Sequence, residues 1–148
     1  MKTRTLILAS LTVVLVLGVM SSAWAQQVQL NARKEKTING IQAELRGSYR
    51  ANPNPNRLNA ELDRINIPLG TPVAFCMLQN GVKTLIGVGR VAMVGGVPEA
   101  SVELSANDGA VVPIVSAGDV LQARQRKVAP FKSKPTCGTG LLISAAFQ

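Results

Sequence analysis

The chain contains no histidine. Without histidine, neither a Ser-His-Asp or Cys-His nucleophile nor a zinc site with imidazole ligands can be assembled. The two cysteines, Cys76 and Cys137, are too far apart to form a CxxC redox motif. No P-loop and no glycine fingerprint ahead of a helix is found in the sequence. These absences disfavour most enzyme classes, so we predict a protein with no catalytic residues, no cofactor and no metal site.

Aromatic residues are also scarce: the chain has one tryptophan, one tyrosine and three phenylalanines. The tryptophan, Trp24, lies in an N-terminal segment that we expect to be removed. Tyr49 falls on the apolar side of an alternating segment, which favours a place in the core. A sugar-binding module that stacks rings on its ligand is therefore disfavoured, although one that only forms hydrogen bonds stays open. Nucleic acid is a poor candidate as well, because single strands are bound largely by stacking.

Acidic residues are half as numerous as basic ones, eight against 16. Most of them occupy outward positions of alternating segments, where a solvated face explains them, so we do not expect a carboxylate pair for glycoside hydrolysis. Asn107-Asp108-Gly109 is too sparse in ligands for calcium and fits a turn. Asp119 fits a turn too. The eight residues are Glu35, Glu44, Glu61, Asp63, Glu99, Glu103, Asp108 and Asp119.

The first 25 residues have the three parts of a secretory signal peptide in order. Lys2 and Arg4 make a basic start, 6–20 is almost wholly apolar, and Ala23-Trp24-Ala25 is a small-x-small cleavage site. The apolar run of about 15 residues is short for a membrane span, which takes roughly 20. We expect cleavage before Gln26, a periplasmic or extracellular location, and no integral membrane span in the mature chain. An uncleaved N-terminal anchor is the alternative.

Cleavage would leave residues 26–148, enough for one domain, and removing Lys2 and Arg4 would lower the net charge from +8 to +6. Two cysteines without metal-site spacing, in an oxidising compartment, predict a disulfide between Cys76 and Cys137. Two unpaired buried thiols are the alternative. If the bond forms, it ties the loop before the last strand to a central strand.

The sequence of the rest of the chain predicts strands separated by turns, with no convincing helix. Asn39-Gly40 and Asn80-Gly81 predict hairpins, and the phase of alternation slips near Asp63-Arg64, which predicts a bulge. Gly87 and Gly89 lie within a strand and indicate a bend or close backbone packing. The expected strands cover 28–36, 41–50, 58–67, 73–79, 82–94, 100–105, 120–128 and 141–147. This pattern predicts an all-β fold: a single antiparallel β-sandwich, or barrel-like, domain of about eight strands.

The order of these signatures resembles an uncharacterised family of small secreted bacterial all-β domains. The resemblance spans most of 28–147 and implies a fold rather than a chemistry, so it supplies no catalytic residues. This chain departs from the family pattern in its two cysteines and in its basic loop at 124–140. The residues that carry the resemblance are Ile38-Asn39-Gly40, Ile65-Asn66-Ile67-Pro68-Leu69-Gly70-Thr71, Asn80-Gly81, Val102-Glu103-Leu104, Asn107-Asp108-Gly109, Val112-Pro113, Ala117-Gly118-Asp119 and 141–147.

Clustered basic residues are the one positive functional signal. No acid occurs after Asp119, while five cations follow: Arg124, Arg126, Lys127, Lys132 and Lys134. A second basic group, Arg33, Lys34 and Lys36, lies in the first strand. Such patches attract anions over about 8–10 Å at physiological salt. We predict a secreted, non-enzymatic β-sandwich that serves as a structural or protein-interaction module. The alternative is a module whose late cations bind an acidic protein or an anionic surface, such as a cell-wall polymer, an acidic glycan or membrane lipid.

Overall fold

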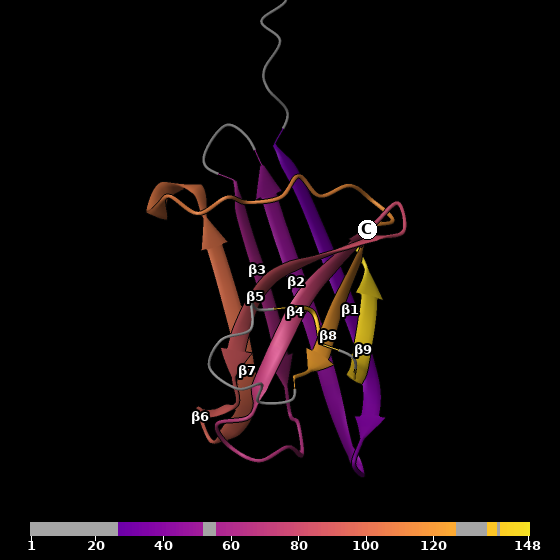
Figure 1. Ribbon diagram of the computed structural model, residues 1–148, viewed down its shortest axis with the longest axis vertical. Helices are drawn as coiled ribbons and strands as arrows, with labels where there is room; N and C mark the ends of the chain where they lie inside the picture. Colours follow the sequence, from indigo (N-terminus) through magenta and orange to yellow (C-terminus); the bar gives the residue numbers. More distant parts are fainter. Residues whose placement is uncertain (1–26, 52–55, 127–135, 139) are drawn as a thin grey trace, which may run out of the picture.

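Alternating apolar and polar residues build two antiparallel sheets that face each other (Figure 1). The computed structural model describes residues 27–51, 56–126, 136–138 and 140–148. Within these ranges the chain forms nine strands and one short 3-10 turn, η1 (Ala106–Asp108). The predicted all-β sandwich is therefore confirmed. Among the described residues, no helix is long and apolar enough to cross a membrane.

The five-stranded sheet, sheet A, has the strand order β1-β2-β3-β7-β6, and the four-stranded sheet, sheet B, has the order β5-β4-β8-β9. The strands of sheet A are β1 (Val28–Ile38), β2 (Ile41–Ala51), β3 (Arg57–Asp63), β6 (Ala92–Val94) and β7 (Val97–Ser105). The strands of sheet B are β4 (Pro72–Gln79), β5 (Val82–Arg90), β8 (Val120–Gln125) and β9 (Gly140–Ala146).

Two short turns form the hairpins that the sequence predicts. Asn39 and Gly40 have φ values of 49° and 81°, and Asn80 and Gly81 have values of 49° and 80°. Positive φ at both central residues is what a type I′ turn requires, and its twist matches that of the flanking strands. The β1–β2 and β4–β5 hairpins are therefore specified locally.

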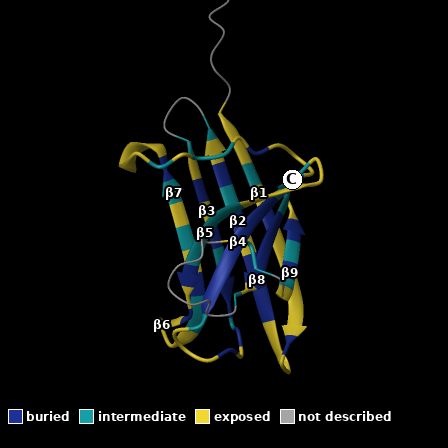
Figure 2. Ribbon diagram, viewed as in Figure 1, coloured by how far each residue is buried: buried dark blue, intermediate teal, exposed yellow. Residues whose placement is uncertain are grey.

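The core lies between the sheets and includes the Tyr49 ring, as predicted (Figure 2). β4 is the central strand that its apolar sequence indicates, with β5 on one side and β8 on the other. Its Val73, Phe75 and Met77 face the core, while Cys76 is buried although it lies outside that cluster. Burial on both faces explains why β4 shows no alternation.

The expected single strand over 82–94 is wrong. β5 ends at Arg90 in sheet B, Val91 is buried, and β6 continues in sheet A. The predicted close packing at the glycines does occur. A Cβ on Gly89 would lie 2.6 Å from the backbone oxygen of Ser101, and one on Gly87 would lie 2.6 Å from Val102 Cγ1. The chain changes sheets here, and this gives nine strands in the described residues rather than about eight.

At Asp63-Arg64, where the slip of phase predicts a bulge, the strand itself ends. β3 ends at Asp63, and Arg64 adopts a left-handed conformation with φ 54°. The turn reverses which face the following residues occupy, so Ile65 is buried and its N–H donates to the Pro98 carbonyl. Register shifts occur instead at Phe75/Cys76 in β4 and at Ala123/Arg124 in β8. A change of phase in the sequence thus marked the end of a strand.

Other strand limits shift by a few residues. The first strand continues to Ile38 because it runs directly into the Asn39-Gly40 turn. The strand expected over 120–128 ends at Gln125. The last strand begins at Gly140, one residue early, and Phe147 then forms an isolated bridge to Ala32 of β1.

Candidate functional site

Four acidic residues form one line across the outer face of sheet A, the face turned away from sheet B. Strand register places Glu35 opposite Glu44, Glu44 opposite Asp63, and Asp63 opposite Glu99. We call these four residues the carboxylate row. Like charges directly opposite each other on paired strands are destabilising. Cations held against the row would offset this repulsion.

Three arginines, the arginine shell, supply those cations. Arg46 Nη2 lies 3.2 Å from Glu44 Oε2 and also donates to Asp63 Oδ2. Arg64 Nη2 lies 2.6 Å from Glu44 Oε2, and its Nε lies 3.2 Å from Asp63 Oδ1. Arg33 Nε forms an ion pair with Glu44 Oε1. The left-handed conformation of Arg64 brings its side chain back over the row that β3 has just left.

The shell encloses carboxylates that were expected to be solvated. Glu44 is only 2% exposed and Asp63 is 7% exposed. The alternation assigned Glu44 to the correct face, but the expectation of solvent around it is wrong. The aliphatic part of an arginine side chain packs over neighbouring residues, and its guanidinium has five N–H donors. Arginines can therefore replace water around the carboxylates.

Two carboxylates on this face, Glu44 and Glu61, have pKa values shifted in opposite directions. Burial acts to raise the pKa of Glu44, but the hydrogen bond and charge of Arg46, together with Arg33, outweigh burial and lower it. Glu61 lacks such a close cation, since Arg46 Nη1 is 3.5 Å away. Burial and the nearby charge of Glu99 therefore raise the pKa of Glu61. Glu44 is held as an anion that anchors arginines.

Replacing Glu44 with glutamine should lower the free energy of unfolding near pH 7 by about 1–2 kcal/mol. The estimate is modest because the arginines are partly exposed and water can replace some lost contacts. A carboxyl whose folded pKa is lowered stabilises the fold above its ordinary value of 4.5 and loses that effect as the pH falls through the lowered pKa. The difference between variant and wild type should therefore shrink when the pH is lowered from 7 to a value below 4.5.

Urea unfolding at the two pH values measures this effect, with Glu103→Gln as the matched control. Glu103 forms a single exposed pair with Arg57 at 2.7 Å. Its loss should change stability by less than about 0.5 kcal/mol. Two results would contradict the assignment of Glu44 as the buried anion that anchors the arginine shell. One is an equal effect of the two substitutions on the free energy of unfolding, and the other is an effect of Glu44→Gln that does not depend on pH.

Two of the hollows on this face are lined by arginines of the shell. One has a volume of about 420 Å³ and lies over the carboxylate row and arginine shell, with Val94 and Val97 at its border. The other, of about 350 Å³, adjoins it and is lined by Arg33 and Arg46 together with Asn31, Ser48 and Asn59. Met93 and Val94 of β6 are more than half exposed. The face thus combines fixed charges, amide and hydroxyl groups, and a small apolar border.

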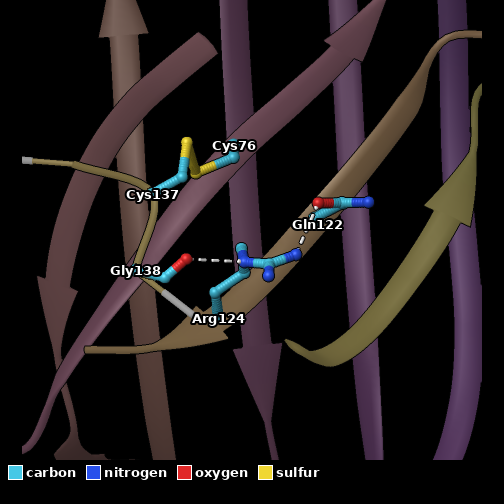
Figure 3. The surroundings of a disulfide bond; sticks show 5 residues. All are labelled: Cys76, Gln122, Arg124, Cys137 and Gly138. Carbon is cyan, nitrogen blue, oxygen red and sulfur yellow. Dashed lines mark hydrogen bonds between the residues drawn. A yellow bond between two sulfur atoms is a disulfide. The ribbon is translucent and has the colours of Figure 1, made fainter. Parts of the chain in front are cut away.

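The predicted disulfide is present: Cys76 and Cys137 are bonded, with their Cα atoms 5.9 Å apart (Figure 3). Cys76 lies in β4 and is fully buried. Cys137 lies just before β9, separated from Cys76 by 61 positions. The bond therefore joins the segment before the last strand to the centre of sheet B, as expected.

Arg124, the first of the expected anion-binding residues, acts within the fold. It is 9% exposed, its Nε donates to the Gly138 carbonyl at 3.1 Å, and its Nη1 donates to Gln122 Oε1 at 3.0 Å. Figure 3 shows this guanidinium beside the disulfide. Arg124 thus holds the residue next to Cys137, and its donors are directed to the protein rather than to solvent.

Of the other members of that set, only Arg126 lies in the described residues. Arg126 follows the end of β8, and its backbone N–H donates to the Pro72 carbonyl while its side chain is half-buried. Lys127, Lys132 and Lys134 lie outside the described residues. The alternation that placed Arg124 and Arg126 on one strand face ends at Gln125. Anion binding by this set stays a prediction.

Sequence reasoning did not find the carboxylate row. A signal was present, because charged residues recur two apart on successive strands, as in Arg33/Glu35, Glu44/Arg46 and Glu61/Asp63. Their convergence depends on strand register, and the pairing of β3 with β7 joins strands that are distant in the chain. Local pattern alone does not supply such a register.

No protein-family model matches the chain, and no curated protein or solved structure matches it. The resemblance to small secreted bacterial domains therefore stays a prediction. What can be said of function rests on the surfaces of this molecule.

Proposed function

We propose that the protein is a secreted, non-enzymatic β-sandwich that serves as a protein-interaction module and binds its partner on the outer face of sheet A. The observation that carries the proposal is the 420 Å³ hollow, where fixed charges lie beside the exposed Val94 and Val97. Soluble proteins use such a combination of an apolar contact and prearranged charges to bind partners.

The arginine shell supports this proposal through its geometry. Each shell arginine is already paired with Glu44, so its side chain is partly ordered before a partner arrives. Ordering long side chains at an interface costs about 0.5–1.5 kcal/mol each, and prearrangement reduces that cost. The same arginines remain 42–70% exposed, so their outer donors can reach a partner's carboxylates or carbonyls.

Export is part of the proposal. The basic start, apolar run and Ala23-Trp24-Ala25 site support cleavage before Gln26 and a periplasmic or extracellular location. The bonded Cys76–Cys137 pair supports the same location, because structural disulfides persist mainly in oxidising compartments. A purely structural module would need no exposed contact surface. Variants that remove the contact at this surface therefore distinguish a structural module from an interaction module.

A photo-reactive side chain at Val94, in exported protein that starts at Gln26, should crosslink a partner from the exported proteins of the same cells. Val111 provides the matched control position. It is 92% exposed and lies between η1 and β8, in the segment that crosses the end of the sandwich opposite β6 (Figure 1). Val94→Asp should weaken binding of the crosslinked partner at least tenfold, and Val111→Asp by less than twofold.

Salt distinguishes the two interaction hypotheses. Binding through sheet A should be lost in Val94→Asp and keep its apolar component at high salt. The alternative, an anionic surface bound by Arg126, Lys127, Lys132 and Lys134, should appear as heparin retention that falls steeply with salt and is unchanged by Val94→Asp. Equal crosslinking at positions 94 and 111 would contradict the proposal.

A further inference from the structure

β1 and β9 begin to pair as neighbouring strands and then separate. At one end, the Asn31 N–H donates to the Gln148 carbonyl at 3.1 Å and the Gln148 N–H donates back at 2.9 Å. Ala32 and Phe147 form the adjoining antiparallel bridge. Continuing this register would pair Arg33 with Ala146. This bridge is isolated, and beyond it β1 is paired in a ladder with β2 and not with β9.

This separation leaves a row of backbone groups on β1 without a strand partner. In an antiparallel strand, residues two apart direct their N–H and C=O groups to the same side. Since those of Asn31 point to β9, those of Glu35 and Thr37, which lie beyond the bridge, point the same way. All residues from 33 to 37 are exposed. We call this stretch of β1 the open edge.

Two lysines explain why the open edge does not close on β9. Lys34 and Lys36 share the side of β1 that carries the buried Ala32 and Ile38. Lys36 Nζ donates to the Leu142 carbonyl of β9 at 2.9 Å, and no ion pair of Lys34 is found among the described residues. Full pairing of β1 with β9 would bury both ammonium groups without counter-charges, which is costly.

Lysine on an edge strand also prevents indiscriminate strand addition. The open edge carries Arg33, Lys34, Glu35 and Lys36, with a net charge of two positive units. A second copy of this chain would oppose like charges if it paired through the same edge. A strand with acidic residues at alternate positions would instead place carboxylates beside the two lysines.

We propose that the open edge of β1 accepts an extended, acidic segment of a partner protein as an added strand. Backbone hydrogen bonds from Glu35 and Thr37 hold the segment, and its acidic side chains neutralise Lys34 and Lys36. Affinity comes from the main chain and specificity from charge, as in other cases of strand addition. β1 and β6 are opposite edges of sheet A, so the backbone groups of the open edge lie apart from Val94, although the side chains of Arg33 and Glu35 line the same hollow as Val94.

The test uses a synthetic octapeptide of alternating glutamate and threonine, added to isotope-labelled protein. Binding should slow the hydrogen exchange of the Glu35 and Thr37 amides. An octapeptide of lysine and threonine should bind at least tenfold more weakly, and so should the acidic peptide when alternate amides are N-methylated. The protein variant Lys34→Glu/Lys36→Glu should reverse the preference between the acidic and basic peptides.

A second variant guards against loss of folding. Lys34→Gln/Lys36→Gln keeps the size and polarity of both side chains and should lose the preference for the acidic peptide. No slowing of exchange at Glu35 and Thr37, or equal binding of the two peptides by wild type, overturns the proposal. Loss of acidic-peptide binding in Val94→Asp would also overturn it, since the peptide would then bind at the sheet A hollow.

Discussion

Cys137→Ser should lower the free energy of unfolding by about 4 kcal/mol. The bond to Cys76 closes a loop across 61 positions, and the chain-entropy model gives about 3 kcal/mol for short loops and 4.7 for very long ones. Cys137 is half-buried, so a serine there adds little cost of its own. Urea unfolding of the oxidised wild type and the variant measures the difference.

Two controls separate the bond from the side chain. Wild type unfolded with a reductant present should lose the same stability as Cys137→Ser. The variant itself should be insensitive to the reductant, because it has no bond left to break. A variant as stable as oxidised wild type would mean that the unfolded chain gains little freedom when the bond is absent. Arg124 and Gly138 would then hold this segment without covalent help.

Gly89→Ala should destabilise the fold by about 3 kcal/mol or more. The new Cβ would lie 2.6 Å from the Ser101 oxygen and 3.0 Å from the Ser101 nitrogen. Both are backbone atoms of β7, so they cannot rotate away, and β5 would have to move off the adjoining sheet. The result should be a large fall in the midpoint of urea or thermal unfolding.

Gly140→Ala is the matched control, because a Cβ there meets its nearest atom at 3.5 Å, an ordinary contact. It should change stability by less than about 0.5 kcal/mol. Gly87→Ala should be intermediate, since its closest neighbour is a side-chain atom of Val102. If Gly89→Ala were as mild as Gly140→Ala, the close crossing of β5 over β7 would not be a constraint on the fold.

Most of the fold could be predicted from local pattern. The Asn39-Gly40 and Asn80-Gly81 turns favour positive φ at both residues, and alternation identified the buried side of Tyr49. β4 was recognisable as central because both of its faces are apolar. Each of these properties depends on a residue and its close neighbours in the chain.

The candidate site could be predicted only in part. The disulfide followed from counting two cysteines, and the structure confirms it. Arg124 was read as a surface cation, but it donates to Gly138, which only the path of the chain after β8 brings close. Glu44 was expected to meet water, but arginines from β1, from β2 and from the turn after β3 surround it.

The sequence by itself determined the all-β class, the hairpin turns, the central strand and the cysteine pair, because backbone preferences and hydrophobic alternation act over a few residues. Only the tertiary structure decided that the chain changes sheets at Val91 and that four carboxylates align behind an arginine shell. It also decided that β1 separates from β9 beyond the bridge between Ala32 and Phe147. Each of these depends on register between strands that are distant in the sequence. Register is set by packing of the whole core, since a shift of one residue would move every buried side chain to the wrong face.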